Sequence, residues 1–353
     1  MDVTPGSAWH APLRLRIEGG ALVDNWRWLA ARNPTATCGA AIKANGYGLG
    51  APDVMRRLAL AGCVDFFVAT WGEALALGTI PHGASVSVLH GVRAEDMAVA
   101  TNSAARPVLN TLAQVSRWRE TGLACDVMVD TGMNRLGLSV ADALNGALDG
   151  LVIDTLMSHL ASADADEASA LRQSAAFGAL KGRTAAKRMS LANSAGICLQ
   201  GQGGADFAFD LTRPGMALYG GIPRTEAIGH IAQVVTPQAQ ILQRRTVRAG
   251  EAIGYNALFV AARDTQVVTV NLGYADGYLR GFSGTGTAEN GRLHVLGRVS
   301  MDLIALCVDA APDFAEGDWV SIDYDLPTAA AQSGLSQYEL LTGLGARFDR
   351  MWA

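Results

Sequence analysis

The sequence contains little lysine and little cysteine. Of its 28 lysine and arginine residues only three are lysine: Lys43, Lys181 and Lys187. The 5 cysteines are scattered and odd in number, without the spacing of a disulfide framework or a metal site, so they are typical of reduced thiols and no metal is expected. An excess of positive charge is missing too, because the formal net charge is −5, which argues against a nucleic-acid partner.

Long apolar runs are also absent. No stretch reaches the length of a membrane-spanning helix, and the first residues, MDVTPGSAWHAPLRLRI, lack the apolar segment of a signal peptide. These absences predict a soluble, cytoplasmic protein without a membrane partner. The 353 residues, of which 50% are hydrophobic, suffice for one large and one small domain.

Short apolar runs alternate with amphipathic ones through the first two-thirds of the chain. Amphipathic helical patterns cover 51–62, 111–122 and 166–182. The expected strands are 38–44, 64–70, 85–90, 106–110, 125–132, 152–160, 188–193 and 207–215. Strands that alternate with helices imply parallel pairing and right-handed crossovers. Eight such strands fit a (β/α)8 barrel of the TIM type, with a doubly wound sheet as the competing interpretation.

The positions of the polar residues favour the barrel. A polar or charged side chain stands at or near the C-terminal end of seven of these strands: Lys43, His90, Asn110, Asp130, His159, Asn193 and Arg213. Polar groups gathered at those ends describe the mouth of a barrel, whereas an open sheet would concentrate them at one switch point.

The pattern of alternating strands and helices ends near residue 235. Short β-type runs follow, separated by turn sequences such as ADG at 275 and EGD at 316. The sequence therefore predicts an α/β barrel over 1–235 and a C-terminal, mainly β domain over 236–353.

Lys43 stands out because it lies inside the apolar run of GAAIKANGYGLG. Arginine keeps its proton near neutral pH, but a desolvated lysine can lose it, so this position is suited to an amine. A lone lysine here is more often a snorkelling or salt-bridged residue at a strand end. Other polar groups would lie with Lys43 at the same barrel mouth: Tyr47, Ser194 in the ANSAG segment, and Arg213 beside a Pro-Gly turn. Hydroxyls and free N–H groups at loop starts hold phosphate, so the set suggests pyridoxal phosphate bound through an imine.

The chain then resembles the alanine racemase family, fold-type III pyridoxal-phosphate enzymes, along essentially its whole length. Seven segments match family blocks in the family's order: IKANGYGLG, VDTGMNRLGL, SHLASAD, ANSAG, RPGMALYG, GYADGYLR and GRVSMD. The resemblance implies a barrel followed by a β domain, an amino-acid substrate, and a homodimer in which the β domain of one chain completes the active site of its partner. It implies a racemase that interconverts L-alanine and D-alanine for D-alanine biosynthesis or for catabolism.

The resemblance assigns two catalytic bases. Lys43 matches the lysine that forms the Schiff base and serves one face of the substrate Cα, and Tyr255 matches the tyrosine that serves the other face. Racemisation needs both, because a proton leaves one face and another arrives at the opposite face. A tyrosine ordinarily titrates near pH 10 and needs positive neighbours to work near neutrality.

The same resemblance implies further binding residues. Arg213 would face the pyridine nitrogen, and His159 would pack on the cofactor ring. Phosphate and ring contacts are implied for Tyr47, Asn193, Ser194, Gly215, Met216 and Tyr338. Arg135 and Met301 would meet the substrate carboxylate, while Tyr274 and Arg280 would line the approach to the site. A guanidinium fork suits a carboxylate.

Two departures from the family pattern concern efficiency. Met128 stands where many members have a lysine that orients the arginine equivalent to Arg135, so we expect an anion or another carboxylate to take that place, or substrate binding to be weak. Ser190 replaces a histidine that links the base tyrosine to the ring-facing arginine. A serine passes on a hydrogen bond but carries no charge, which predicts a pH optimum on the alkaline side.

Other functions stay open at this stage. A racemase of broad specificity or one for serine would use the same machinery, because small changes decide side-chain size. A decarboxylase of the same build would place an acidic residue at the pyridine nitrogen, so Arg213 argues against it. A non-catalytic carrier of the cofactor would resemble the barrel alone, so the β domain with Tyr255 argues against that.

Overall fold

The structure is a computed structural model that describes residues 10–201 and 206–353. The described chain divides into two compact units. One comprises Ala21–Ala232, and the other combines the described residues up to Gly20 with Gln233–Ala353. Each unit is built on its own sheet.

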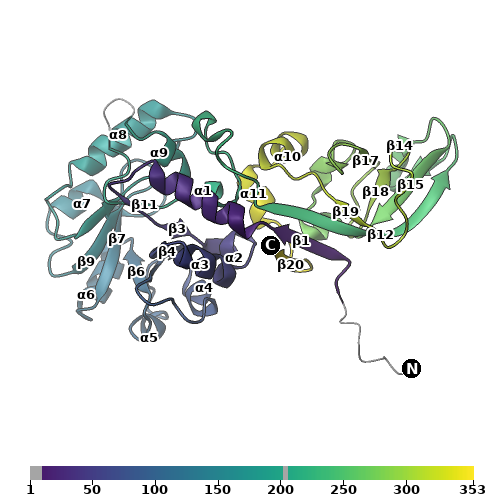
Figure 1. The fold of residues 1–353 in the computed structure, drawn as a ribbon. Helices are drawn as coiled ribbons and strands as arrows, with labels where there is room; N and C mark the ends of the chain where they lie inside the picture. Colours follow the sequence, from purple (N-terminus) through teal and green to yellow (C-terminus); the bar gives the residue numbers. More distant parts are fainter. Residues whose placement is uncertain (1–9, 202–205) are drawn as a thin grey trace, which may run out of the picture. The chain divides into compact units, whose positions relative to one another are not determined.

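The Ala21–Ala232 unit is a parallel barrel (Figure 1). Its strands are β2 (Thr37–Cys38), β3 (Ala40–Ala41), β4 (Asp65–Val68), β5 (Ser85–Val88), β6 (Arg106–Leu109), β7 (Ala124–Asp130), β8 (Leu138–Ser139), β9 (Val152–Met157), β10 (Arg188–Ser190) and β11 (Leu211–Thr212). They follow the order β2-β11-β10-β9-β7-β6-β5-β4-β3, with β8 beside β7. Each of the eight predicted barrel strands overlaps one of them.

The barrel closes at a single chain segment. The two ends of the strand order, β2 and β3, are separated only by Gly39. The N–H of Gly39 donates to Thr212 O at 2.9 Å on one side, and the N–H of Ile42 donates to Phe67 O at 2.8 Å on the other. A Cβ on Gly39 would lie 2.8 Å from Asp65 O, so the closure requires glycine. The predicted barrel is confirmed, and the doubly wound alternative is excluded.

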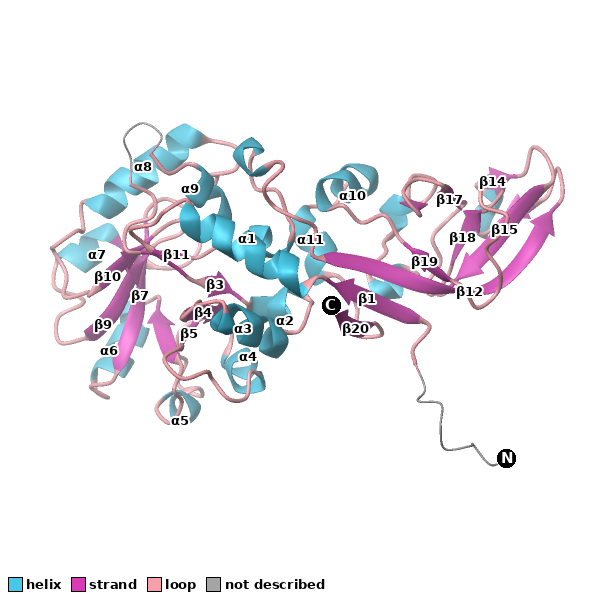
Figure 2. Ribbon diagram, viewed as in Figure 1, coloured by secondary structure: helices cyan, strands magenta, loops and turns pink. Residues whose placement is uncertain are grey.

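Helices and short 3-10 turns connect the strands and flank them on the outside (Figure 2). They are α1 (Gly19–Ala31), α2 (Lys43–Tyr47), α3 (Ala51–Leu60), α4 (Trp71–Ala76), α5 (Met97–Ala100), α6 (Leu112–Arg119), α7 (Val140–Leu144), α8 (Glu167–Gly178), α9 (Ser194–Cys198), η2 (Met216–Tyr219) and η3 (Thr225–Ala227). Several begin at a side-chain N-cap, among them Thr70, Thr111, Ser139, Asp166 and Asn193. The barrel strands are buried on both faces, which explains their uninterrupted apolar runs.

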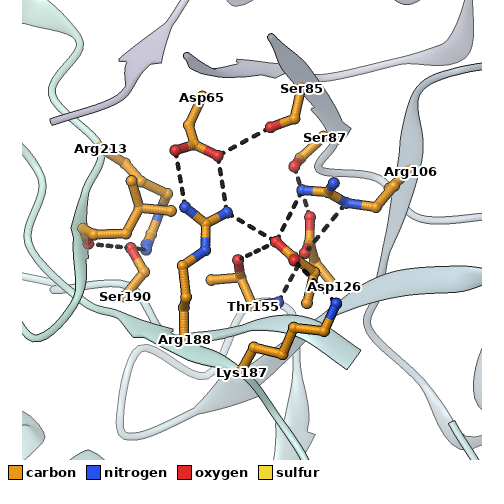
Figure 3. Close-up of polar contacts among 12 residues, drawn as sticks. Asp65, Ser85, Ser87, Arg106, Asp126, Thr155, Lys187, Arg188, Ser190 and Arg213 are labelled. Carbon is orange, nitrogen blue, oxygen red and sulfur yellow. Dashed lines mark hydrogen bonds and ion pairs between the residues drawn. The ribbon is translucent and has the colours of Figure 1, made fainter. Parts of the chain in front are cut away.

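A polar network occupies the interior near the N-terminal ends of the strands (Figure 3). Arg188 donates to both carboxylate oxygens of Asp65, at 2.9 and 2.8 Å, and to Asp154 at 2.8 Å. Asp126, which is fully buried, accepts from Ser87 Oγ at 2.6 Å. Burial raises the pKa of Asp126, and the positive charge of Arg106 opposes that rise. The network joins strands that are not neighbours in the sheet, since Asp65 lies on β4 and Arg188 on β10.

The second unit is mainly β. Its elements are β1 (Leu13–Ile17), β12 (Val235–Val247), β13 (Ala252–Ile253), η4 (Tyr255–Ala257), β14 (Phe259–Val260), β15 (Thr265–Val270), η5 (Tyr274–Asp276), η6 (Arg280–Phe282), β16 (Thr287–Ala288), β17 (Leu293–Leu296), β18 (Ile304–Cys307), β19 (Trp319–Ser321), α10 (Leu326–Ser333), α11 (Gln337–Thr342) and β20 (Asp349–Trp352). The main sheet has the order β16-β17-β18-β15-β12-β1-β20, with β19 also paired to β12.

Strand β12 organises this sheet. Its first half pairs antiparallel with β1, with Leu13 opposite Ala239, and its second half pairs antiparallel with β15. A register shift between Ile241 and Gln243 separates the two halves. The sequence did not predict β1.

Among the described residues, no helix is both long enough and apolar enough to cross a bilayer.

Candidate active site

The C-terminal ends of the barrel strands carry the predicted chemical groups. Lys43 comes two residues after β3, His159 two residues after β9, and Arg213 immediately after β11. Asn193 caps α9 by accepting the N–H of Gly196 at 3.0 Å. Parallel strands in a barrel end on one face, so these residues share the barrel mouth.

Lys43 is followed by a left-handed turn. Ala44, Asn45, Gly46 and Tyr47 all have positive φ, at 52°, 52°, 64° and 52°. A left-handed conformation costs about 1–2 kcal/mol for each residue other than glycine. Hydrogen bonds hold the turn: the N–H of Gly46 donates to Ile42 O at 2.8 Å, and the N–H of Ala51 donates to Asn45 Oδ1 at 3.0 Å. The backbone that presents Lys43 is therefore strained and strongly tied.

The electrostatic surroundings of Lys43 lower the pKa of its amine. Burial lowers the pKa of the Lys43 amine, and the positive charges of Arg135 and Arg213 lower it further, while the carboxylate of Glu73 opposes them. A lysine in such surroundings accepts a proton more readily from a substrate near neutral pH than an exposed lysine does.

Arg213 is held from two strands. Its guanidinium donates to the hydroxyl of Ser190 and to the carbonyl oxygen of Ser158. Only 7% of the residue is exposed, and burial lowers its pKa to about 10, with the negative charge of Asp126 opposing the change. Arg213 therefore remains a cation near neutral pH, fixed at the mouth.

His159 stays uncharged at the same mouth. Burial lowers the pKa of its imidazole to about 3, reinforced by the positive charges of Arg213, Lys43 and Arg135. A neutral ring among cations is suited to packing against a flat group rather than to carrying charge.

A small cradle forms where β3 and β11 end. Ser194 Oγ accepts the N–H of Gly215 at 3.0 Å and that of Ala217 at 3.3 Å. A Cβ on Gly215 would lie 2.2 Å from Tyr47 Oη, so the tyrosine hydroxyl and this backbone approach closely. The ring of Tyr47 stacks on Tyr219 with centroids 4.6 Å apart. Met216 begins η2 directly beside this cradle.

Arg135 lies exposed on the loop after β7. The carboxylate of Asp130 accepts the N–H groups of Gly132, Met133 and Arg135, at 2.8, 2.9 and 3.2 Å, and so sets the path of this loop. Met128 is buried on β7, and its side chain packs close to Gly137 at the end of the same loop. Met128 therefore contributes apolar packing where a lysine is usual in the resembled family.

Five predicted site residues lie on the second unit. Tyr255 begins η4 and is 64% exposed, and Met301 is 54% exposed. The N–H of Tyr274 donates to Ser300 O at 3.0 Å, and the guanidinium carbon of Arg280 lies 5.0 Å from the centre of the Tyr274 ring. The backbone at Tyr274 is therefore bonded to the segment that carries Met301. Tyr338 lies on α11.

The sequence did not predict two groups that hold the site residues in place. The Ser158 carbonyl that holds Arg213 has no sequence signal, because every residue offers one. Glu73 accepts the N–H of Ala44 next to Lys43 at 2.7 Å; its only sequence signal is a capping-box pattern with Thr70. Among the described residues, no group of three or more His, Cys, Asp or Glu side chains could hold a metal ion.

Comparisons with known proteins cover nearly the whole chain. A model of the alanine racemase N-terminal domain matches residues 17–223, and one of the alanine racemase C-terminal domain matches residues 234–352. An alanine racemase from Acidiphilium cryptum is 41% identical over 96% of this chain and 98% of its own length. A catabolic alanine racemase from Agrobacterium fabrum is 40% identical over 98% of this chain and 93% of its own length.

A solved structure agrees with these relatives. The crystal structure of alanine racemase from Bartonella henselae, with covalently bound pyridoxal phosphate, superposes with a TM-score of 0.88 at 34% identity. The match covers 97% of this chain and 99% of that one. Fold, order of domains and sequence therefore agree along nearly the full length: the chain belongs to the alanine racemase family, whose members are isomerases.

Proposed function

We propose that this protein interconverts L-alanine and D-alanine with pyridoxal phosphate bound to Lys43. The observation that carries the proposal is the barrel mouth, which combines an amine of lowered pKa, a buried cation and a neutral imidazole in a chain that matches the two alanine racemase domains over 17–223 and 234–352.

The residues at the mouth fit this cofactor. The close approach of Tyr47 Oη to Gly215, with Ser194 Oγ beside them, makes a cradle of hydroxyls and backbone suited to a phosphate. Met216, Asn193 and Tyr338 would complete the binding residues. When bound, pyridoxal phosphate withdraws electrons from the substrate and makes its Cα proton acidic.

The protein's own groups then move the protons. Lys43, whose surroundings lower the pKa of its amine, takes or returns the Cα proton on one face. Tyr255 serves the opposite face from the partner chain. Arg135 and Met301 hold the substrate carboxylate, and Tyr274 lines the approach. Arg213, a cation near neutral pH, would keep the cofactor's ring nitrogen unprotonated, and His159 would support the ring without adding charge.

A homodimer with shared sites belongs to the proposal. In it, the barrel expected over 1–235 holds the cofactor, and the β domain expected over 236–353 supplies Tyr255 to its partner. Support comes from two exposed apolar side chains that follow Tyr255 in the sequence, since Leu258 is 61% and Val260 is 52% exposed. Exposed apolar groups in a cluster are typical of a surface covered by another protein.

Reductive trapping tests the cofactor lysine. Borohydride reduction of the protein loaded with pyridoxal phosphate, followed by digestion and mass spectrometry, should place the label on the Lys43 peptide and leave the exposed Lys181 and Lys187 unlabelled. A panel of amino acids with chiral product analysis should show alanine as the preferred substrate.

Two variants complete this test. Lys43→Ala and Tyr255→Phe should each lower kcat by roughly a thousandfold or more, whereas the control Lys181→Ala should retain activity. Label on Lys181 or Lys187, or carbon dioxide as the product, would contradict the proposal, and preference for serine would correct the substrate.

A further inference from the structure

Glu73 connects two loops of the barrel mouth. It lies on α4, where it forms a capping box with Thr70. One carboxylate oxygen accepts the N–H of Ala69, just after β4, at 2.6 Å, and the other accepts the N–H of Ala44 at 2.7 Å. The end of β4 and the residue next to Lys43 are therefore joined by a single side chain.

The Ala44 bond is made at the start of the left-handed turn. Ala44 and Tyr47 adopt positive φ, which their side chains disfavour, so local preference opposes the turn at these two residues and outside contacts help to keep it. Bonds such as Gly46 N–H to Ile42 O lie within the segment. Glu73 supplies a contact from another element, and Figure 1 shows α2 and α4 gathered near β3 and β4.

Glu73 is also an anion close to Lys43. The charges that act on the Lys43 amine come from Arg135, Glu73 and Arg213, and Glu73 is the negative one among them. Glu73 therefore balances the cations around the amine as well as holding its backbone.

We propose that Glu73 is a positioning residue for Lys43: by accepting the N–H of Ala44, it ties the left-handed turn to the end of β4 and fixes the point from which the lysine side chain begins. The proposal rests on the proposed function only in taking Lys43 as the cofactor amine. Glu73 itself touches no reacting atom in this role.

Hydrogen exchange of the full-length chain, without and with added pyridoxal phosphate, tests the tie directly. In Glu73→Gln, one amide oxygen replaces two acceptors, so exchange of the peptide covering 44–51 should become about tenfold faster. Thr70→Ala is the matched control, because it removes the hydroxyl that accepts the Glu73 N–H but leaves the bond to Ala44. It should loosen α4 alone.

Kinetics separate positioning from mere stability. Glu73→Gln should lower kcat about tenfold while KM changes by less than about twofold, and Thr70→Ala should change neither. Adding Ala44→Gly to Glu73→Gln should restore part of kcat, because glycine adopts positive φ without strain and the Ala44 side chain is exposed.

Three results would overturn the proposal: unchanged exchange over 44–51 in Glu73→Gln, faster exchange there without a loss of kcat, or equal effects of Thr70→Ala on both measurements. The exchange measurement needs no activity. It therefore tests whether Glu73 holds the turn even if racemisation of alanine is not found.

Discussion

Ser190 shows how much one hydroxyl group decides. Its oxygen accepts a hydrogen bond from Arg213, and its O–H donates to the carbonyl oxygen of Leu211 at 2.5 Å. In the family pattern inferred from the sequence, a histidine at this position would link the tyrosine matched by Tyr255 to the arginine matched by Arg213. The serine proton is already used within the barrel, so Ser190 can hold Arg213 but has no second proton to pass on. The alkaline pH optimum inferred from this position stays a prediction.

His159 gives a prediction about pH. Burial, together with three nearby cations, moves the pKa of its imidazole from 6.5 to about 3 in the folded chain. As the pH falls below 6.5, the unfolded chain binds a proton that the folded chain does not bind until about pH 3. The free energy of unfolding therefore decreases over that window, by at most about 1.4 kcal/mol per pH unit.

His159→Gln should remove this contribution. Urea unfolding of the cofactor-free protein, repeated from pH 7 down to about pH 4, should show a shallower loss of stability in His159→Gln than in the wild type. The exposed His82→Gln variant serves as the control and should follow the wild type. Identical pH dependence in all three proteins would refute the neutral imidazole.

At the scale of elements, the Asp65–Arg188 pair links β4 to β10 across the barrel interior (Figure 3). Asp65 is buried, and Arg188 also contacts Asp154. Removing one partner leaves a charge that burial has partly stripped of water, so Asp65→Ala should lower the free energy of unfolding by about 3 kcal/mol.

A surface pair on α1 provides the comparison. Asp24 and Arg27 form an ion pair whose side chains are both well exposed, so Asp24→Ala should cost less than about 1 kcal/mol. Urea unfolding monitored by circular dichroism measures both variants. Equal losses in Asp65→Ala and Asp24→Ala would mean that the interior network contributes no more than a surface contact.

The sequence predicted the barrel strands well for a physical reason. Parallel strands buried on both faces, such as Asp65–Val68 and Arg106–Leu109, read as apolar runs whatever surrounds them. The interior network could not be predicted in this way, because Asp65 and Arg188 are ordinary residues at strand starts and their pairing depends on closure of the barrel. The left-handed turn was equally hidden, since Ala44 and Tyr47 carry no preference for positive φ.

At the scale of the whole molecule, β1 shows that local sequence patterns do not predict which strands pair. Its residues, LRLRI, pair with β12 more than two hundred residues later, Leu13 lying opposite Ala239, and no local signal records such a partner. The predicted site residues themselves fall on two units. Lys43, His159 and Arg213 lie on the barrel, and Tyr255 and Met301 lie on the β unit.

The proposed homodimer, in which two chains share each site, predicts complementation. In a mixed dimer of a Lys43→Ala chain and a Tyr255→Phe chain, one site combines both defects, and the other combines an intact barrel with an intact β domain. Unfolding and refolding an equal mixture should therefore restore about a quarter of the wild-type activity, because about half of the dimers are mixed and each has one good site. Each variant refolded alone provides the control. If every site drew Lys43 and Tyr255 from the same chain, the mixture would stay as inactive as its components, and the shared-site homodimer would have to be abandoned.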